Sequence, residues 1–387
     1  MTTVALIHFN HVLIDGKVGW PDPGTTDARP NYGDMLVCAA ILGHLAPGLR
    51  TTRTGFGRKL TTPCDFALIR GSTYLSTRFN YRAAIDTLDS IDAPLSIVGL
   101  GAQAPTQDPR FLDDHADARE FVAKLAEKSK SISVRGPFTA ELLTRLGARD
   151  IRITGCPSLF HGGGIPQVAL PEALGSPRQR LGVSLHTGLR RTIYCRDPEA
   201  VRARHIEAMR YTIEAASEAA FFEQGVKSEF DAADSRLPME SRLAAARQVL
   251  DRIGGADALR PEDLVTHMVS VRGVGDWLDR AGRMDAVLGF RFHGNMAALL
   301  QSVPCFYWTY DSRLREFCDL YNLPWQDAAE QWRDPVRAIL DHDWDAANAA
   351  FRHCYAELHA FYDENGVPHR LSPPAQIPAR IPAIRPA

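Results

Sequence analysis

Short apolar runs recur through the first part of the chain, and each one stops at a small or polar turn. The runs that predict strands are residues 4–9, 65–69, 94–98, 131–134 and 151–154. Helix-forming stretches separate them, among them residues 35–45 and 140–146. Because strands that alternate with helices are typical of a parallel sheet covered by helices, this part predicts a Rossmann-like domain over residues 1–164.

The same alternation returns after a break. Residues 161–166 read His-Gly-Gly-Gly-Ile-Pro, which favours neither helix nor strand and predicts a hinge between two domains. Beyond the hinge, strands are expected at residues 180–185, 220–224, 265–269 and 286–290, and helices at 198–220, 227–260 and 274–281. The pattern predicts a second Rossmann-like domain over residues 165–330, C-terminal helices over 331–370 and a disordered proline-rich tail over 371–387.

Composition narrows the class of protein without selecting a function. The 387 residues are 45% hydrophobic, which is ample for two buried cores. The 44 basic and 46 acidic side chains give a net charge of -2, so nothing favours nucleic acid as a partner. Seven scattered cysteines without a C-x-x-C pair indicate reduced thiols rather than a zinc site. No apolar segment approaches the roughly 18 residues of a membrane span, and we expect a soluble cytoplasmic protein.

Candidate chemistry concentrates between residues 285 and 324. An apolar run over 286–290 stops at Arg291-Phe292-His293-Gly294-Asn295, which we interpret as a polar turn before a helix. Ser302-Val303-Pro304 then begins another strand. In open α/β sheets a ligand lies beyond the carboxyl ends of the strands, where turn N–H groups and a helix N-terminus favour an anion. Arg291 and His293 are expected at that place.

Two earlier turns also follow predicted strands. Asn31 and Asp34 can cap the helix that begins there, and Gly33 would let a ligand approach the backbone, although an ordinary N-cap explains the motif equally well. Gly101 and Gln103 belong to a Gly-Leu-Gly-Ala-Gln turn that suits either a close ligand or a common structural turn.

The order and spacing of these motifs resemble the polysaccharide pyruvyl transferases. That family has a strand ending in Gly-x-Arg-x-His-Gly, a Ser-Val-Pro or Gly-Val-Pro turn and an Asp-Ser-Arg segment, and here they stand as residues 289–294, 302–304 and 311–313. The Asn-x-Gly-Asp helix start at 31–34 and the Ser-x-Arg turn ending at Arg135 match as well. The Arg70-Gly71-Ser72 turn departs from the family, in which many members have a glycine triplet.

The resemblance implies an activity and a site. The implied enzyme moves the pyruvyl group of phosphoenolpyruvate onto a sugar of a polysaccharide, or of its lipid-linked precursor, as a ketal. It implies two Rossmann-like domains facing across a cleft, as in glycosyltransferase-B folds, and no cofactor besides phosphoenolpyruvate as co-substrate. Assembly into a homo-oligomer is left open. The expected substrate-binding residues are Arg135, Asn31, Gly33, Asp34, Gly71, Gly101, Gln103, Gly294, Asn295, Asp311 and Arg313.

The residues suit this chemistry. Phosphoenolpyruvate carries a carboxylate and a phosphate, and arginine binds such groups through two parallel N–H bonds. Arg291 and Arg135 are expected to reach the two anionic ends from opposite domains. His293 is the candidate general acid, because histidine exchanges a proton near neutral pH. Asp311, Arg313 and Glu316 either line the cleft or pair on a surface helix.

Other functions remain open on the sequence alone. A nucleotide-sugar glycosyltransferase could use the same Arg/His cleft, and a metabolite sensor could bind phosphoenolpyruvate without turnover. A nicotinamide enzyme is disfavoured, because no Gly-x-Gly-x-x-Gly with a following acidic residue is present. We expect no metal site, since the histidines considered (161, 186, 205, 267, 293 and 353) share no ligand spacing with carboxylates or thiols.

Overall fold

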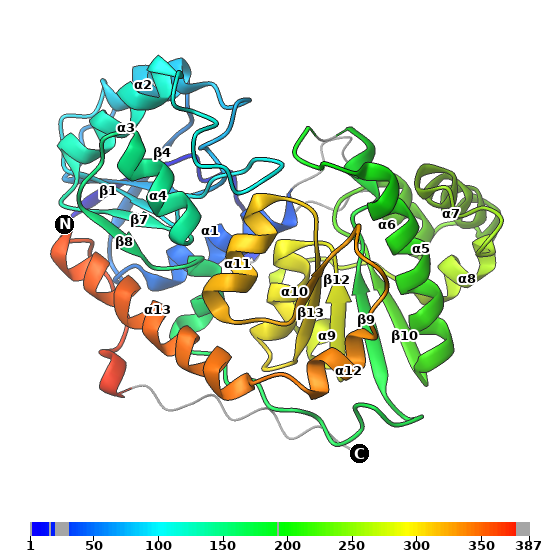
Figure 1. Cartoon of the computed structure of the whole chain (residues 1–387). Helices are drawn as coiled ribbons and strands as arrows, with labels where there is room; N and C mark the ends of the chain where they lie inside the picture. The colour runs from blue at the N-terminus through cyan, green and yellow to red at the C-terminus, as the bar shows by residue number, and fades with distance from the viewer. Residues whose placement is uncertain (1, 15–16, 20–30, 192, 377–387) are drawn as a thin grey trace.

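Two parallel β-sheets stand in two neighbouring domains (Figure 1). The structure is a computed structural model, and it describes residues 2–14, 17–19, 31–191 and 193–376. The sheets confirm the predicted fold class, two Rossmann-like α/β domains in a glycosyltransferase-B-like arrangement with a C-terminal helical segment. The domain limits at residues 164 and 330 stay predictions.

The N-terminal sheet has a buried centre and a more exposed edge strand, β4 (Arg50–Thr54). Its other strands are β1 (Thr3–Ile7), β5 (Phe66–Arg70) and β6 (Leu95–Val98), and a parallel pair continues it, β7 (Ile132–Val134) and β8 (Ile151–Ile153). The order is β4-β1-β5-β6 and all pairings are parallel. Every residue of β5 and β6 is buried, as expected for parallel strands covered by helices. The helices are α1 (Tyr32–His44), α2 (Tyr81–Leu88), α3 (Ala116–Lys128) and α4 (Pro137–Arg145).

The C-terminal sheet has six parallel strands in the order β11-β10-β9-β12-β13-β14. They are β9 (Arg180–Ser184), β10 (Glu218–Phe222), β11 (Met268–Val269), β12 (Ala286–Gly289), β13 (Cys305–Thr309) and β14 (Trp325–Asp327). The helices are α5 (Pro198–Ala215), α6 (Lys227–Ala233), α7 (Met239–Ile253), α8 (Pro261–His267), α9 (Val274–Gly282), α10 (Phe292–Leu299) and α11 (Ser312–Tyr321). Two 3-10 segments, η1 (Pro157–Gly163) and η2 (Thr187–Arg191), precede and follow β9.

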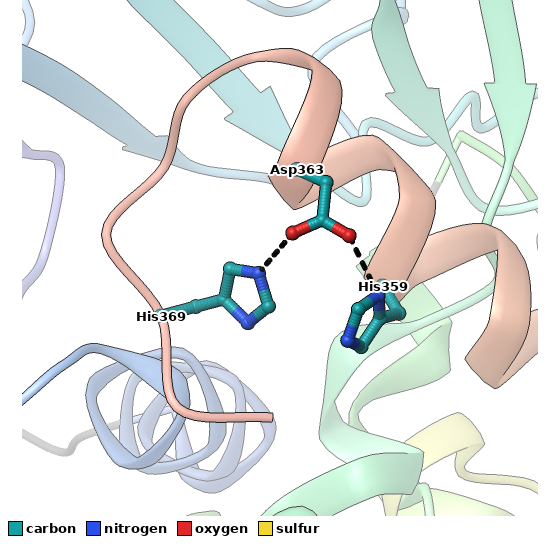
Figure 2. Close-up of side chains that lie close together, drawn as sticks. All are labelled: His359, Asp363 and His369. Carbon is teal, nitrogen blue, oxygen red and sulfur yellow. Dashed lines mark hydrogen bonds and ion pairs between the residues drawn. The ribbon is translucent and has the colours of Figure 1, made fainter. Parts of the chain in front are cut away.

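The C-terminal helices tie the two domains together. They are α12 (Pro335–Leu340) and α13 (Trp344–Glu364), followed by the 3-10 turn η3 (Pro374–Gln376). In Figure 1 α13 runs back to the N-terminal domain, where Arg152 of β8 pairs with Glu357 at 2.8 Å and with Glu364 at 2.7 Å. The segment after α13 is held by Asp363, which lies 3.0 Å from His359 Nδ1 and 2.9 Å from His369 Nε2 (Figure 2).

Two predicted elements differ from the structure. Of the strand predicted at 265–269 only β11 (Met268–Val269) is present. Residues 265–267 are the end of α8, because Pro261 at the first helical position and Asp263, which accepts from the Arg260 N–H, start a helix there. The turn predicted at residues 291–295 ends at Arg291, since α10 begins at Phe292. Asn295 supports that helix from inside, because its Oδ1 accepts from Ser184 and its Nδ2 donates to the Phe306 carbonyl.

Two segments of the chain lie largely outside the described residues. Residues 12–14 and 17–19 form the antiparallel pair β2 (Val12–Ile14) and β3 (Lys17–Gly19), whereas 20–30 are not described. Residues 377–387 of the predicted tail are likewise outside the described residues. Among the helices that are described, none has both the length and the apolar character needed to cross a membrane.

Candidate functional site

One pocket gathers the loops that follow the strands of both sheets. Its volume is about 270 Å³. The N-terminal domain contributes the start of α1 and the turns after β5, β6 and β7, and the C-terminal domain contributes the turns after β9, β10, β12 and β13. The lining residues are Asn31, Gly33, Asp34, Ser72, Thr73, Gln103, Arg135, His186, Tyr194, Gln224, Arg291, Phe292, His293 and Arg313.

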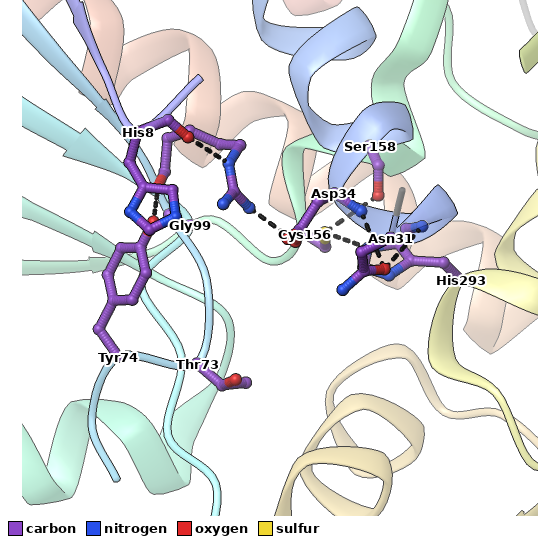
Figure 3. Close-up of polar contacts among 12 residues, drawn as sticks. His8, Asn31, Asp34, Thr73, Tyr74, Gly99, Cys156, Ser158 and His293 are labelled. Atoms are coloured by element: carbon purple, nitrogen blue, oxygen red, sulfur yellow. Dashed lines mark hydrogen bonds and ion pairs between the residues drawn. The ribbon is translucent and has the colours of Figure 1, made fainter. Parts of the chain in front are cut away.

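The start of α1 forms one wall of this pocket. The Asn31 side chain caps the helix by accepting from the N–H groups of Gly33 and Asp34. Asp34 pairs with the buried Arg70 at 2.7 Å, and Arg70 also donates to the His8 carbonyl. Figure 3 shows Asn31 and Asp34 side by side, with His293 approaching from the other domain. The motif is therefore an N-cap and a pocket wall at once.

His293 is wedged between two N-terminal segments. A Cβ on Gly33 would lie 2.2 Å from His293 Nδ1, so only glycine leaves room for the ring. On its other side, Nε2 lies 3.7 Å from Cys156 Sγ, which in turn lies 3.0 Å from Ser158 Oγ (Figure 3). Burial lowers the pKa of His293 well below its usual range, and the charges of Arg135 and Arg313 lower it further. The imidazole is neutral at neutral pH unless an anion comes close.

Arg291 occupies the N-cap of α10. Its side chain makes no capping hydrogen bond, and its Nε donates to the Leu185 carbonyl at 3.0 Å. Among the described residues, no carboxylate forms an ion pair with this guanidinium. Burial lowers the pKa of Arg291, and the attraction of Glu229 opposes that effect. A partly buried guanidinium without a carboxylate partner favours a bound anion.

Arg135 faces Arg291 from the N-terminal domain. Its Nε donates to the Gly99 carbonyl at 3.0 Å and its Nη2 to the Gly71 carbonyl at 3.3 Å. The guanidinium also lies 5.5 Å from the centroid of the Phe292 ring. These contacts hold the plane of the guanidinium at the pocket wall.

A third arginine and a second histidine complete the cationic lining. Arg313 Nη2 donates to Tyr310 Oη, and the same hydroxyl lies 2.7 Å from His186 Nδ1. Burial lowers the pKa of His186 well below its usual range, and Arg291 lowers it further. Asp311 lies 3.4 Å from Arg313 and accepts a 2.8 Å hydrogen bond from Gln103, which links the two domains.

With this geometry, comparison with known proteins decides the family. The family model described as polysaccharide pyruvyl transferase matches residues 15–312, which is most of the chain. The chain belongs to the polysaccharide pyruvyl transferase family. A search of curated proteins found no match.

Solved structures are similar at low identity. The S. aureus MnaA–UDP co-structure is 12% identical, covers 98% of this chain and 100% of its own, and has a TM-score of 0.45. UDP-GlcNAc 2-epimerase from Neisseria meningitidis bound to UDP-GlcNAc is 9% identical over 95% and 94% of the two chains, with a TM-score of 0.42. Anabaena Alr3699/HepE in complex with UDP and glucose is 7% identical over 94% and 96%, with a TM-score of 0.43.

In this member of the pyruvyl transferase family, five residues that were expected to bind substrate do not line the pocket. Gly71 and Gly101 make room for backbone and for Arg135, because a Cβ there would lie 2.1 Å from the Val98 carbonyl and 2.9 Å from Arg135 Cδ. Gly294 and Asn295 are part of α10 and do not line the pocket. Asp311 does not line it either, but it contacts two residues that do, Gln103 through a hydrogen bond and Arg313 through an ion pair. The expected residues that line the pocket are Asn31, Gly33, Asp34, Gln103, Arg135, Arg291, His293 and Arg313.

Sequence reasoning missed Thr73, Tyr194 and Gln224, which also line the pocket. Gln224 carried a usable signal, since it ends the run predicted as a strand at 220–224 and so belongs to the carboxyl edge of the sheet.

Glu316 lies outside the pocket. It is buried, and both its oxygens accept from Thr139, the Oε1 from the N–H and the Oε2 from the hydroxyl.

The group His359, Asp363 and His369 has the composition of a metal site (Figure 2). Its hydrogen bonds favour a different interpretation. His369 Nδ1 accepts a 3.2 Å hydrogen bond from the Leu371 N–H, so its Nε2 carries the proton that is donated to Asp363. A metal on Nε2 would move this proton to Nδ1, against the Leu371 N–H. The group therefore fits a hydrogen-bonded clamp better than a metal centre.

Proposed function

We propose that the protein transfers the pyruvyl group of phosphoenolpyruvate to a saccharide and forms a pyruvate ketal. The observation that carries the proposal is the convergence of Arg135, Arg291 and Arg313 on one pocket, together with His186 and His293, whose pKa values are lowered by burial. A ligand with two separate anionic groups matches cations that arrive from two domains.

The size of the pocket favours this donor over a nucleotide sugar. A volume of about 270 Å³ is at the lower end of the roughly 300–1,000 Å³ typical of ligand pockets. A small enol phosphate suits such a space, whereas a nucleoside diphosphate sugar would extend well beyond it.

An adjoining cavity of about 650 Å³ suits the acceptor. Tyr310 and Asp311 line this cavity, and the same two residues contact Arg313 of the donor pocket. Thr106 and Asp197 face it from the two sides. Carboxylates of this kind accept hydrogen bonds from sugar hydroxyls, and protein hydroxyl and backbone groups can donate or accept them.

The proposed reaction needs a proton at C3 and a site for the leaving phosphate. Protonation of the enol carbon makes C2 electrophilic, one sugar hydroxyl forms a C2–O bond, and the bond from C2 to the phosphate oxygen breaks. A second hydroxyl then closes the ketal. Of the two hydroxyl protons, one restores the acid and the other leaves with phosphate. A bound anion raises the pKa of His293 towards neutrality, which supports His293 as the acid.

Phosphate release tests the proposal directly. The protein is incubated with phosphoenolpyruvate and a panel of galactosyl, mannosyl and glucosyl acceptors, and inorganic phosphate and the ketal are measured. We expect release with one class of acceptor and a loss on the order of 10²–10³-fold in Arg291→Met, because a charge-stabilising donor is removed. Arg337→Met is the matched control, since Arg337 is exposed on α12 with a side-chain exposure of 72%.

The competing functions give different results. Phosphoenolpyruvate should raise the melting temperature while nucleotide sugars leave it unchanged, because only a ligand of the folded state stabilises it. Stabilisation by nucleotide sugars alone would indicate a glycosyltransferase. Binding of phosphoenolpyruvate without phosphate release for any acceptor would indicate a metabolite-binding protein.

A further inference from the structure

Gln224 lines the donor pocket and carries a buried side-chain amide. The residue follows β10, is 8% exposed and lines the pocket. Its Nε2 has no hydrogen-bond partner among the described residues. Its backbone is fixed, since the Gln224 N–H donates to the buried Glu229. Buried amide groups are rarely left unsatisfied in native proteins, so an amide held at a pocket wall points to a ligand.

The fold makes room for this amide at the start of α10. A Cβ on Gly294 would lie 2.4 Å from Gln224 Nε2 and 2.4 Å from Ser184 Cβ. Glycine at this position lets the Gln224 side chain lie against the first turn of the helix. Gly294 thus makes room for Gln224 although it does not itself line the pocket.

The first turn of α10 supplies further donors. The backbone N–H groups at the start of a helix have no partner within the helix, and Arg291 at the N-cap provides no side-chain cap. The guanidinium of Arg291 adds a charge at the same place, and Phe292 and His293 of this turn line the pocket. Helix N–H groups, an amide and a guanidinium together resemble a phosphate cradle.

The opposite wall offers fewer donors. Arg135 already donates to the carbonyls of Gly99 and Gly71, so one edge of its guanidinium is committed to the protein. A phosphate has three terminal oxygens and more charge than a carboxylate, and it therefore needs the wall with more donors.

We infer that the phosphate of the donor binds on the first turn of α10 with Gln224 Nε2 as one of its hydrogen-bond donors, and that the carboxylate lies toward Arg135. This inference rests on the proposed function for the identity of the donor. It adds Gln224 as a substrate-contacting residue and gives the donor an orientation across the two domains.

Separate anions test the two ends. Binding of inorganic phosphate, pyruvate and phosphoenolpyruvate is measured by calorimetry on the full chain. Gln224→Leu should weaken phosphate and phosphoenolpyruvate on the order of tenfold to a hundredfold and leave pyruvate unchanged, as expected for a lost hydrogen bond to a charged group. Gln224→Glu, which keeps the shape of the side chain, should weaken phosphate further. Arg135→Met should weaken pyruvate more than phosphate.

The control is Gln248→Leu, on the exposed face of α7, which should bind all three ligands as the unsubstituted protein does. Unchanged phosphate binding in both Gln224 variants would overturn the inference, and so would the lack of measurable phosphate binding to the unsubstituted protein. If phosphoenolpyruvate is turned over with the same KM in Gln224→Leu, the inference fails while the proposed function stands. If phosphate binding depends on Gln224 but no acceptor gives turnover, the proposed function fails instead.

Discussion

Arg70 and Arg291 are arginines at the carboxyl edges of the two sheets, Arg70 fully buried and Arg291 partly exposed, and they are in opposite electrostatic states. Arg70 ends β5 and pairs with Asp34 at 2.7 Å. Burial lowers its pKa, but Tyr74 and Asp34 raise it more. Arg291 follows β12 and has no carboxylate in an ion pair among the described residues, and burial lowers its pKa. Arg70 is thus neutralised within the fold, whereas we propose that Arg291 binds the ligand.

The comparison teaches how to separate structural from functional charges in such a cleft. Residue type and position at a strand end are the same in both domains, so they cannot distinguish the two arginines. What distinguishes them is whether the protein itself supplies the counter-charge. Most polar groups of the N-terminal wall have partners within the protein. On the C-terminal wall, Arg291 has no carboxylate in an ion pair and Gln224 Nε2 has no hydrogen-bond partner among the described residues.

The largest expected effect is on turnover, and it comes from replacing His293, which lines the C-terminal wall of the pocket. His293→Gln should lower kcat by roughly 10² to 10⁴, because a general acid contributes about that much. The variant removes the proton donor but keeps a polar side chain between Gly33 and Cys156. Phosphate release and melting temperature are measured together, with the exposed His353→Gln as the control. Wild-type turnover in a folded His293→Gln protein would show that the histidine is structural, as Arg70 is.

Replacing the two arginines in turn tests the comparison itself. Arg70→Met should lower the free energy of unfolding by about 3 kcal/mol, because it leaves Asp34 without its partner. Because the Asp34 side chain is 23% exposed, we expect a loss at the low end of the roughly 3–5 kcal/mol typical of a broken buried ion pair. Arg291→Met should leave the free energy of unfolding unchanged or raise it, since a partly buried charge without a carboxylate partner is removed.

Urea unfolding of both variants gives the two values under one set of conditions. Equal losses of stability in Arg70→Met and Arg291→Met would remove the distinction between a structural and a ligand-binding arginine.

The sequence was sufficient for the α/β class and for the place of the site, because strand ends and glycine-rich turns are local patterns. It could not show which groups the other domain supplies. Gly33 lines the pocket, but the room left by its missing side chain is occupied by His293 of the opposite domain. Asn295 was expected at the substrate, whereas it bonds to Ser184 and Phe306 within its own domain. Such contacts join residues more than a hundred positions apart, or depend on where a helix begins.

Replacing Glu223 should have the smallest predicted effect, a change in how stability depends on pH. Its buried carboxyl differs from both arginines because it can lose its charge by taking up a proton. Its carboxyl lies after β10 and accepts hydrogen bonds from Tyr32 Oη at 3.0 Å, across the domains, and from the Gly225 N–H at 2.8 Å. Burial raises its pKa from 4.5 to about 7. Below about pH 7 Glu223 keeps its proton and so carries no buried charge. Arg70 is instead paired with Asp34, and Arg291 has no carboxylate in an ion pair among the described residues.

This difference predicts a pH dependence. Between about pH 4.5 and pH 7 the folded protein keeps a proton on Glu223 that the unfolded chain releases, so the free energy of unfolding falls as pH rises through this range. One pKa unit corresponds to about 1.4 kcal/mol, which gives a fall on the order of 2 kcal/mol between about pH 5 and pH 7. Glu316, whose pKa burial also raises to about 7, adds a similar fall of its own. Glu223→Gln should remove its share of the slope in urea unfolding across that range, while the exposed Glu240→Gln should not. Identical slopes in the wild type and Glu223→Gln would mean that Glu223 is ionised in the folded protein, with Tyr32 stabilising a buried anion.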